Sequence, residues 1–285
     1  RPGRVKSTSH PAMSWHGVVT EREDMYQSIA TEIDGAVGIL TLNRPARHNA
    51  LDETLITEIT TGLLALEAAA SVRVVVLSSA GGTFCAGADM NWLRRETTNS
   101  LQENLRDARH LGRLMATLNN LSKPTIGRIQ GPSFGSGVGL VACCDIAVAT
   151  YDAQFALSDV KLGIIPAVVS PFIMAAIGER FVRRYTLSAE RFSAAEAYRI
   201  GLVHEIVPDE TQLDQALFEI VENLLKNGPQ AMAECKSMLR AFSRHPINDA
   251  VIEEAAQRMA RVRCSPEGKE GLSAFIEKRK PNWIG

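Results

Sequence analysis

The segment of residues 123–166 constrains the fold of this chain more than any other part of its sequence. An apolar run at residues 125–129 suits a short buried strand. Several glycines and other turn-forming residues follow it, and residues 137–144 then have the character of an apolar helix start. Glycine lets two backbones approach closely because it has no Cβ, and a helix N-terminus directs free N–H groups toward one point. This strand–loop–helix unit therefore predicts a site for a phosphate, a carboxylate or a developing oxyanion.

The chain before this segment repeats the same order of elements. Residues 28–34 and 37–42 alternate or cluster apolar residues on either side of a glycine, which predicts a hairpin. Residues 51–70 carry leucine and isoleucine at spacings of three and four, which predicts a helix. A valine-rich strand at 73–78 leads through a glycine loop to a second long helix at 99–121. Strands that alternate with helices indicate an α/β fold with crossover connections.

The chain after residue 193 changes character, because helical patterns replace the alternation apart from a short strand at 204–207. The predicted helices span residues 209–226, 229–243, 246–262 and 265–278. A helical region of this size is typical of a segment that docks on a neighbouring subunit, so an oligomer is expected.

The chain accordingly divides into three parts. Residues 1–24 are expected to be a detachable extension, derived from a vector or from a transit peptide. Residues 25–208 form the predicted α/β core, and residues 209–285 form the helical region.

Composition narrows the function classes. The net charge is −1, which argues against nucleic acid or an anionic membrane as a partner. No apolar run approaches the roughly 18–20 residues of a membrane span. The 5 cysteines lack Cys-x-x-Cys spacing, so the sequence predicts a reduced cytoplasmic protein without a metal site.

Two short glycine motifs suggest other enzymes. Residues 131–135 match the G-x-S-x-G pattern of serine hydrolases, with Ser133 as the nucleophile. The glycines of residues 135–139 resemble a dinucleotide-binding fingerprint, but Leu140 stands at its final position. Both patterns are short enough to arise by chance. The structural alternative is that these residues only form a turn.

For three aspartates, a structural role has to be weighed against a functional one. Asp159 lies in a strongly apolar context, so it is either an exposed residue at a strand end or a buried base with a raised pKa. Asp89 ends a glycine loop and suits a helix N-cap. Asp145 begins a strand and is interpreted as structural.

Several blocks of sequence together carry a family resemblance. They are residues 43–51, 82–90, 123–166, 189–208 and 274–283. In this order and spacing they resemble the crotonase (enoyl-CoA hydratase/isomerase) family over residues 28–285. Within that family, residues 170–185 are similar to bacterial methylglutaconyl-CoA hydratase-like members.

The resemblance implies an α/β fold that is a crotonase-like spiral of β/β/α units with a C-terminal helical trimerisation region. It also implies a homo-oligomer, a trimer or a hexamer of two trimers. The implied partner is an acyl-CoA thioester, with coenzyme A as part of the substrate and no separate cofactor.

The resemblance further implies an oxyanion hole made by the backbone N–H groups of Ala88 and Ser136. Reactions at C2 of a thioester pass through an enolate-like state, and each positioned N–H donor contributes ~2.7–4 kcal/mol to its stabilisation. The implied CoA contacts are Arg44, Arg47, Ala86, Asp89, Phe275 and Lys278.

The chain departs from the family pattern at the two glutamates of typical hydratases. Gly139 stands at the first position and Asp159 at the second. We expect an enoyl-CoA hydratase, with Δ3–Δ2-enoyl-CoA isomerisation by Asp159 alone as the alternative and a non-catalytic acyl-CoA-binding protein as a third class. A Gly139→Glu variant that gains hydration would show that the missing acid limits this enzyme.

Overall fold

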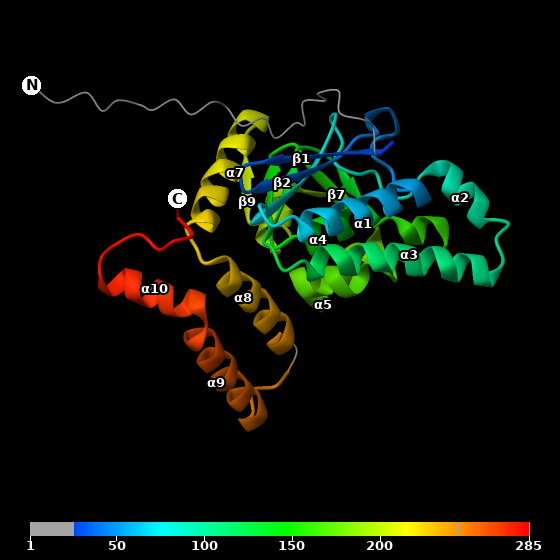
Figure 1. Cartoon of the computed structure of the whole chain (residues 1–285). Helices are drawn as coiled ribbons and strands as arrows, with labels where there is room; N and C mark the ends of the chain where they lie inside the picture. Colours follow the sequence, from blue (N-terminus) through cyan, green and yellow to red (C-terminus); the bar gives the residue numbers. More distant parts are fainter. Residues whose placement is uncertain (1–25, 244, 285) are drawn as a thin grey trace, which may run out of the picture.

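The computed structural model describes residues 26–243 and 245–284, so the predicted extension of residues 1–24 lies outside the described residues. Figure 1 shows a layered α/β body and an arm of three helices set apart from it. The arm consists of α8 (Pro229–Phe242), α9 (Asp249–Cys264) and α10 (Pro266–Ile276). Within the described residues, no helix is long and apolar enough to cross a membrane.

The main sheet has the strand order β1-β2-β3-β4-β6-β9. Its strands are β1 (Ile29–Asp34), β2 (Val37–Leu42), β3 (Val74–Ser79), β4 (Thr125–Ile129), β6 (Ile146–Thr150) and β9 (Glu205–Val207). The predicted hairpin is confirmed as the antiparallel pair β1–β2, and each later neighbour pairs in parallel. Strands β2, β3 and β4 are buried along their whole length, which explains their continuous apolar runs.

Helices pack on both faces of this sheet. Helices α1 (Glu53–Ala68), α3 (Leu101–Asn120), α4 (Ser136–Cys143) and α5 (Ser170–Ser188) contribute to the hydrophobic core on one face. Helix α7 (Glu210–Leu225) contributes to a second core on the other face. Alternate residues of β2 supply the two cores, Leu40 and Leu42 to the first and Val37 and Ile39 to the second.

The predicted long helices are confirmed. Their ends differ from the predicted bounds by a few residues and are set by capping residues. Asp52 caps α1 and accepts a hydrogen bond from the Leu55 N–H at 2.9 Å, as the sequence predicts. The helix predicted at residues 246–262 begins later, at Asp249, because Asn248 accepts from the Val251 N–H and caps it.

The second sheet, helix α6 and the extent of helix α2 were not predicted. The sheet has the order β5-β7-β8, with β5 (Ser133–Phe134), β7 (Gln154–Ala156) and β8 (Phe192–Ser193). The helices are α2 (Met90–Glu96), which begins at the predicted cap Asp89, and α6 (Ala194–Arg199). Elements of two to seven residues carry too few positions for periodicity to reveal them.

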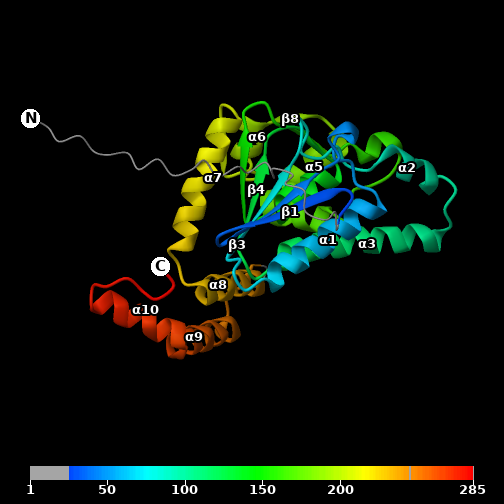
Figure 2. The same ribbon diagram turned by 45° about the horizontal axis from the view of Figure 1, so that its top comes forward.

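Polar contacts join the arm, and the chain that follows it, to the body. Figure 2 shows α8 nearest to the body and α9 and α10 farther out. Lys236 Nζ of α8 lies 2.5 Å from Asp145 Oδ2, and Arg73 donates to the Trp283 carbonyl at 2.9 Å. Asp145 also accepts from the N–H and hydroxyl of Thr125, which confirms its structural role.

Candidate active site

Three chain segments run in parallel toward one edge of the second sheet. The first segment contains Cys85 and the second is β5, and a parallel bridge between Cys85 and Ser133 joins them. The second is joined to the third by the parallel β5–β7 pairing, in which Ser133 faces Phe155. Because parallel segments end at the same edge, the residues that follow each of them meet there.

Two glycines bring the first two segments into backbone contact. Gly87 and Gly135 have φ angles of +89° and +50°, in the region that favours glycine. A Cβ added at Gly87 would lie only 2.9 Å from the carbonyl oxygen of Phe134 and 3.7 Å from the Cα of Gly135. The next residues in the same register are Ala88 and Ser136, so their N–H groups are brought to the same edge.

Neither of these N–H groups donates to a backbone or side-chain acceptor within the described part of the chain. Leu51 donates to the Gly87 carbonyl at 2.7 Å and accepts from the Asp89 N–H at 2.8 Å. In a parallel ladder this pattern turns the N–H of the intervening Ala88 away from Leu51. Ser136 is the first residue of α4, where N–H groups lack intrahelical partners. The pair can therefore bind a developing negative charge.

Asp159 lies beside this pair of donors. It is the first residue of the 3₁₀ helix η2 (Asp159–Leu162), shortly after β7. A Cβ added at Gly135 would lie 4.0 Å from Asp159 Oδ2, so the carboxylate borders the residue that precedes Ser136. Among the described residues, Oδ2 has no hydrogen-bond partner. Burial raises the pKa of Asp159, and a hydrogen bond from its own backbone N–H offsets this only in part.

The position of the missing acid is filled rather than empty. Gly139 is buried in α4, and a Cβ added there would lie 2.6 Å from Val169 Cγ1 and 3.3 Å from Met115 Sδ. A glutamate at residue 139 would therefore not fit unless Val169 moved.

Two potential nucleophiles near the site are unsuited to attack. Ser133 is fully buried on β5, whereas a hydrolase nucleophile must be exposed at the turn. The Cys85 thiol is also buried, and this desolvation raises its pKa to about 12. The structure therefore favours non-covalent chemistry over the G-x-S-x-G interpretation.

The carboxylate of Asp89, the residue that follows Ala88, contacts two arginines. Its carboxylate caps α2 through the Asn91 N–H at 2.8 Å and lies 3.4 Å from Arg44 and 3.3 Å from Arg47. Burial opposes ionisation of Asp89, but this hydrogen bond and the two cations outweigh it and hold its pKa below the usual range. The N-cap interpretation of Asp89 is confirmed.

The arginines differ in what else they can reach. Arg44 is mostly buried and also pairs with Asp52 at 2.7 Å, so its guanidinium is occupied by protein groups. The Arg47 side chain remains 55% exposed and can still approach a ligand. Of these two predicted CoA contacts, Arg47 is the accessible one.

Asn49 is a positioning residue that the sequence did not reveal. It is fully buried with a φ of +53°, and its amide donates to the carbonyls of Ala80 and Thr83 at 2.9 and 2.8 Å. It also accepts from the Arg44 N–H at 2.8 Å. Asparagine tolerates a left-handed conformation, and this is the signal that could have identified it.

The remaining predicted CoA contacts fall in two places. Ala86 lies within the site segment and donates its N–H to the His48 carbonyl at 3.0 Å. Phe275 lies in the last turn of α10 and Lys278 two residues beyond its end, and the Phe275 side chain is 83% exposed. Figure 1 shows α10 in the arm, away from α2 and α4, so a single chain does not bring these two residues to the site.

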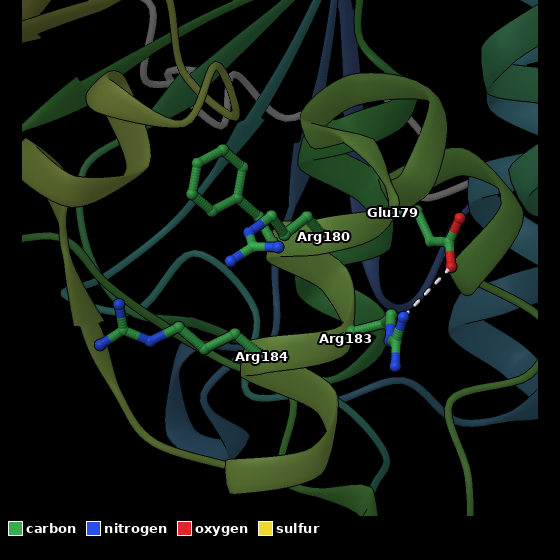
Figure 3. A pocket seen from close by; sticks show the side chains of 5 residues that line it. Glu179, Arg180, Arg183 and Arg184 are labelled. Atoms are coloured by element: carbon green, nitrogen blue, oxygen red, sulfur yellow. Dashed lines mark ion pairs between the residues drawn. The ribbon is translucent and has the colours of Figure 1, made fainter.

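A surface concavity of about 630 Å³ lies elsewhere, on the second half of α5 (Figure 3). Its lining residues are Glu179, Arg180, Phe181, Arg183 and Arg184. It includes none of the groups that converge at Ala88, Ser136 and Asp159, and Glu179 pairs with Arg183 at 3.8 Å. No cluster of three or more potential metal ligands occurs within residues 26–243 and 245–284.

Comparison with known proteins places these features in a family. The profile described as Enoyl-CoA hydratase/isomerase matches residues 32–285. The chain belongs to this family. Its fold is the crotonase fold, and the chain is an enzyme of the enoyl-CoA hydratase/isomerase type.

The relatives include hydratases and isomerases. A solved enoyl-CoA hydratase from Shewanella pealeana is 40% identical, with a TM-score of 0.89 over 91% of this chain and 97% of that chain. The 2,3-dehydroadipyl-CoA hydratase of Escherichia coli is 32% identical, covering 87% of this chain and 94% of its own. A peroxisomal Delta(3,5)-Delta(2,4)-dienoyl-CoA isomerase of Arabidopsis thaliana is 29% identical over 90% and 95% of the two chains.

Proposed function

We propose that this enzyme adds water syn across the C2=C3 bond of a 2-enoyl-CoA thioester whose acyl group is branched or of the glutaconyl type. The observation that carries the proposal is the convergence of two unpaired backbone N–H groups with a half-buried carboxylate whose Oδ2 has no hydrogen-bond partner among the described residues. Hydrogen-bond donors aimed at a developing oxyanion usually provide a large part of catalysis in such reactions. The hydratases among its relatives support the choice of reaction.

In this mechanism the thioester oxygen accepts hydrogen bonds from Ala88 and Ser136. Asp159 takes a proton from water as the water oxygen bonds to C3, and the C2=C3 π electrons move toward the thioester oxygen. The resulting enolate then takes the same proton from Asp159 at C2, which restores the carboxylate. Burial favours this role, because it makes the ionised carboxylate a stronger base.

Isomerisation of a 3-enoyl-CoA is the second candidate, and the presence of glycine at residue 139 favours it. Here Asp159 removes a proton from C2, the same oxyanion hole stabilises the dienolate, and Asp159 returns the proton to C4. The double bond moves to C2=C3 without a change in mass. One carboxylate is sufficient for this reaction.

Incubation of the purified protein with crotonyl-CoA, 3-methylglutaconyl-CoA and a 3-enoyl-CoA, followed by mass spectrometry and ultraviolet detection, distinguishes the candidates. A product heavier by one water from a 2-enoyl-CoA supports the hydratase. A new conjugated product of unchanged mass from the 3-enoyl-CoA alone would replace it with the isomerase. Binding without turnover of any ester would instead indicate an acyl-CoA-binding protein.

A further inference from the structure

We propose that Val169 keeps this site to a single carboxylate, because it fills the space into which any side chain at residue 139 would project. This inference rests on the proposed function, since it assigns Val169 a part in determining which acyl-CoA reactions the site can perform. Val169 would act by exclusion and would contact no reacting atom.

The place of residue 139 in the helix gives this exclusion its importance. Gly139 follows Ser136 by three positions in α4, so the two residues share one face of the helix. The Cα–Cβ bond of a helical residue tilts toward the helix N-terminus. A carboxylate at residue 139 would therefore be directed toward the end of α4 that carries the Ser136 donor.

The contact with Val169 cannot be relieved by side-chain rotation. A Cβ at residue 139 would lie 2.9 Å from Val169 Cβ as well as 2.6 Å from its Cγ1. The Cβ position is fixed by the backbone, and Val169 is buried at the start of α5 together with Met115 of α3. Interiors packed to this density do not yield without cost, so the backbone of α5 would have to move.

A neighbouring glycine provides a contrast. Gly112 of α3 faces the adjacent Val168, but a Cβ there would lie 3.6 Å from Val168 Cγ1, which is an ordinary van der Waals contact. The two glycines therefore differ in whether a side chain fits. The exclusion of a side chain at residue 139 therefore results from the close contact between Gly139 and Val169.

This restriction has a chemical consequence. Val169 and Met115 offer no strong hydrogen-bonding group on the side where a second acid would stand. A water molecule in the site would then be oriented by Asp159 and by the substrate. An acyl group with its own carboxylate can supply that second contact, so the site would hydrate such esters better than simple 2-enoyl-CoA esters.

A double-mutant cycle of Gly139→Glu and Val169→Gly tests the inference, with Gly112→Ala as the matched control. Thermal unfolding needs no substrate, so this readout stays valid if the proposed function fails. Gly139→Glu should unfold at a clearly lower temperature than wild type, and the added Val169→Gly should recover part of that loss. Gly112→Ala should unfold at or above the wild-type temperature.

Hydration of crotonyl-CoA supplies the second readout. The double variant should hydrate it at least about tenfold faster than Gly139→Glu alone, while the latter shows no gain over wild type. A Gly139→Glu protein that unfolds at the wild-type temperature would overturn the inference. So would strictly additive effects of the two substitutions on the unfolding temperature.

Discussion

At the scale of single residues, buried charges in this protein fall into two kinds. Arg128 is fully buried and is bound by Asp214 at 2.7 Å and by Glu210 at 3.1 Å, so its charge is compensated. The Asp159 carboxylate instead carries an oxygen without a hydrogen-bond partner in the described part of the chain. Such a group lowers the stability of the folded state and is typical of a site in which function requires an unpaired base.

Asp159→Asn should abolish turnover and raise the unfolding temperature at neutral pH. The folded state raises the pKa of Asp159, so this residue carries no penalty below its unfolded pKa. The penalty develops as the pH rises through the folded pKa and is complete above it. The difference in unfolding temperature between variant and wild type should therefore grow from acidic to neutral pH.

Differential scanning fluorimetry from about pH 4 to pH 8 measures this trend. Acyl-CoA binding should persist in the variant, because both N–H donors belong to the backbone. A variant that retains full turnover would remove Asp159 from the reaction.

At the scale of elements, the site depends on strands too short to recognise in the sequence. Strands β5 and β7 have two and three residues, yet their parallel pairing carries Asp159 to the residues beside Ser136. The main strands were predictable, because each alternates or clusters apolar residues between turn residues. The short ones exist because of tertiary pairing, which local sequence does not encode.

The glycine before each donor should be sensitive to substitution. Gly87→Ala places a Cβ 2.9 Å from the Phe134 carbonyl oxygen at a φ of +89°. We expect a loss of about 1–2 kcal/mol of stability from the left-handed backbone. Displacement of the Ala88 donor should lower kcat by about 10²-fold.

Gly82→Ala is the matched control, since a Cβ there has nothing within 4 Å. It should retain wild-type kcat and stability in the same steady-state and unfolding assays. Equal kcat values for the Gly87 and Gly82 variants would argue against the assigned donor.

The same scale separates what the sequence could predict about the site from what it could not. Ala88, Ser136 and Asp159 could be predicted because they occupy fixed places in motifs of the family pattern. Val169 and Asn49 act through contacts with residues 30 or more positions away. No short motif contains such contacts, so only the folded structure reveals them.

At the scale of the whole molecule, the arm leaves many of its apolar side chains exposed in a single chain. Helices α8 and α9 have no fully buried residue among those described. Several of the arm's apolar side chains are exposed: Leu239, Ile252, Met259, Leu272, Phe275 and Ile276. Exposed apolar groups concentrated on one part of a protein indicate an interaction surface. We propose that copies of this chain associate through the arm as a trimer or hexamer, which would also let Phe275 and Lys278 reach a neighbouring site.

Leu272→Asp should shift the protein toward smaller species in sedimentation velocity. A charge placed in an apolar interface loses its hydration without gaining a partner. Leu64→Asp on α1 is the control, because Leu64 is 53% exposed and Leu272 is 54% exposed. The control should sediment as wild type, and an unchanged mass for Leu272→Asp would remove this residue from the interface.

The parallel bridge between Cys85 and Ser133 also bears on the order of events during folding. It joins segments that are 48 residues apart, and the pairing of Ser133 with Phe155 closes a further loop. Closing such loops costs entropy before the contacts return it, so these pairings form more slowly than the local turns of α8 and α9. A refolding chain should therefore regain most of its helical signal before it can bind a thioester oxygen. For a newly made chain, the catalytic surface is expected to be among the last parts to mature.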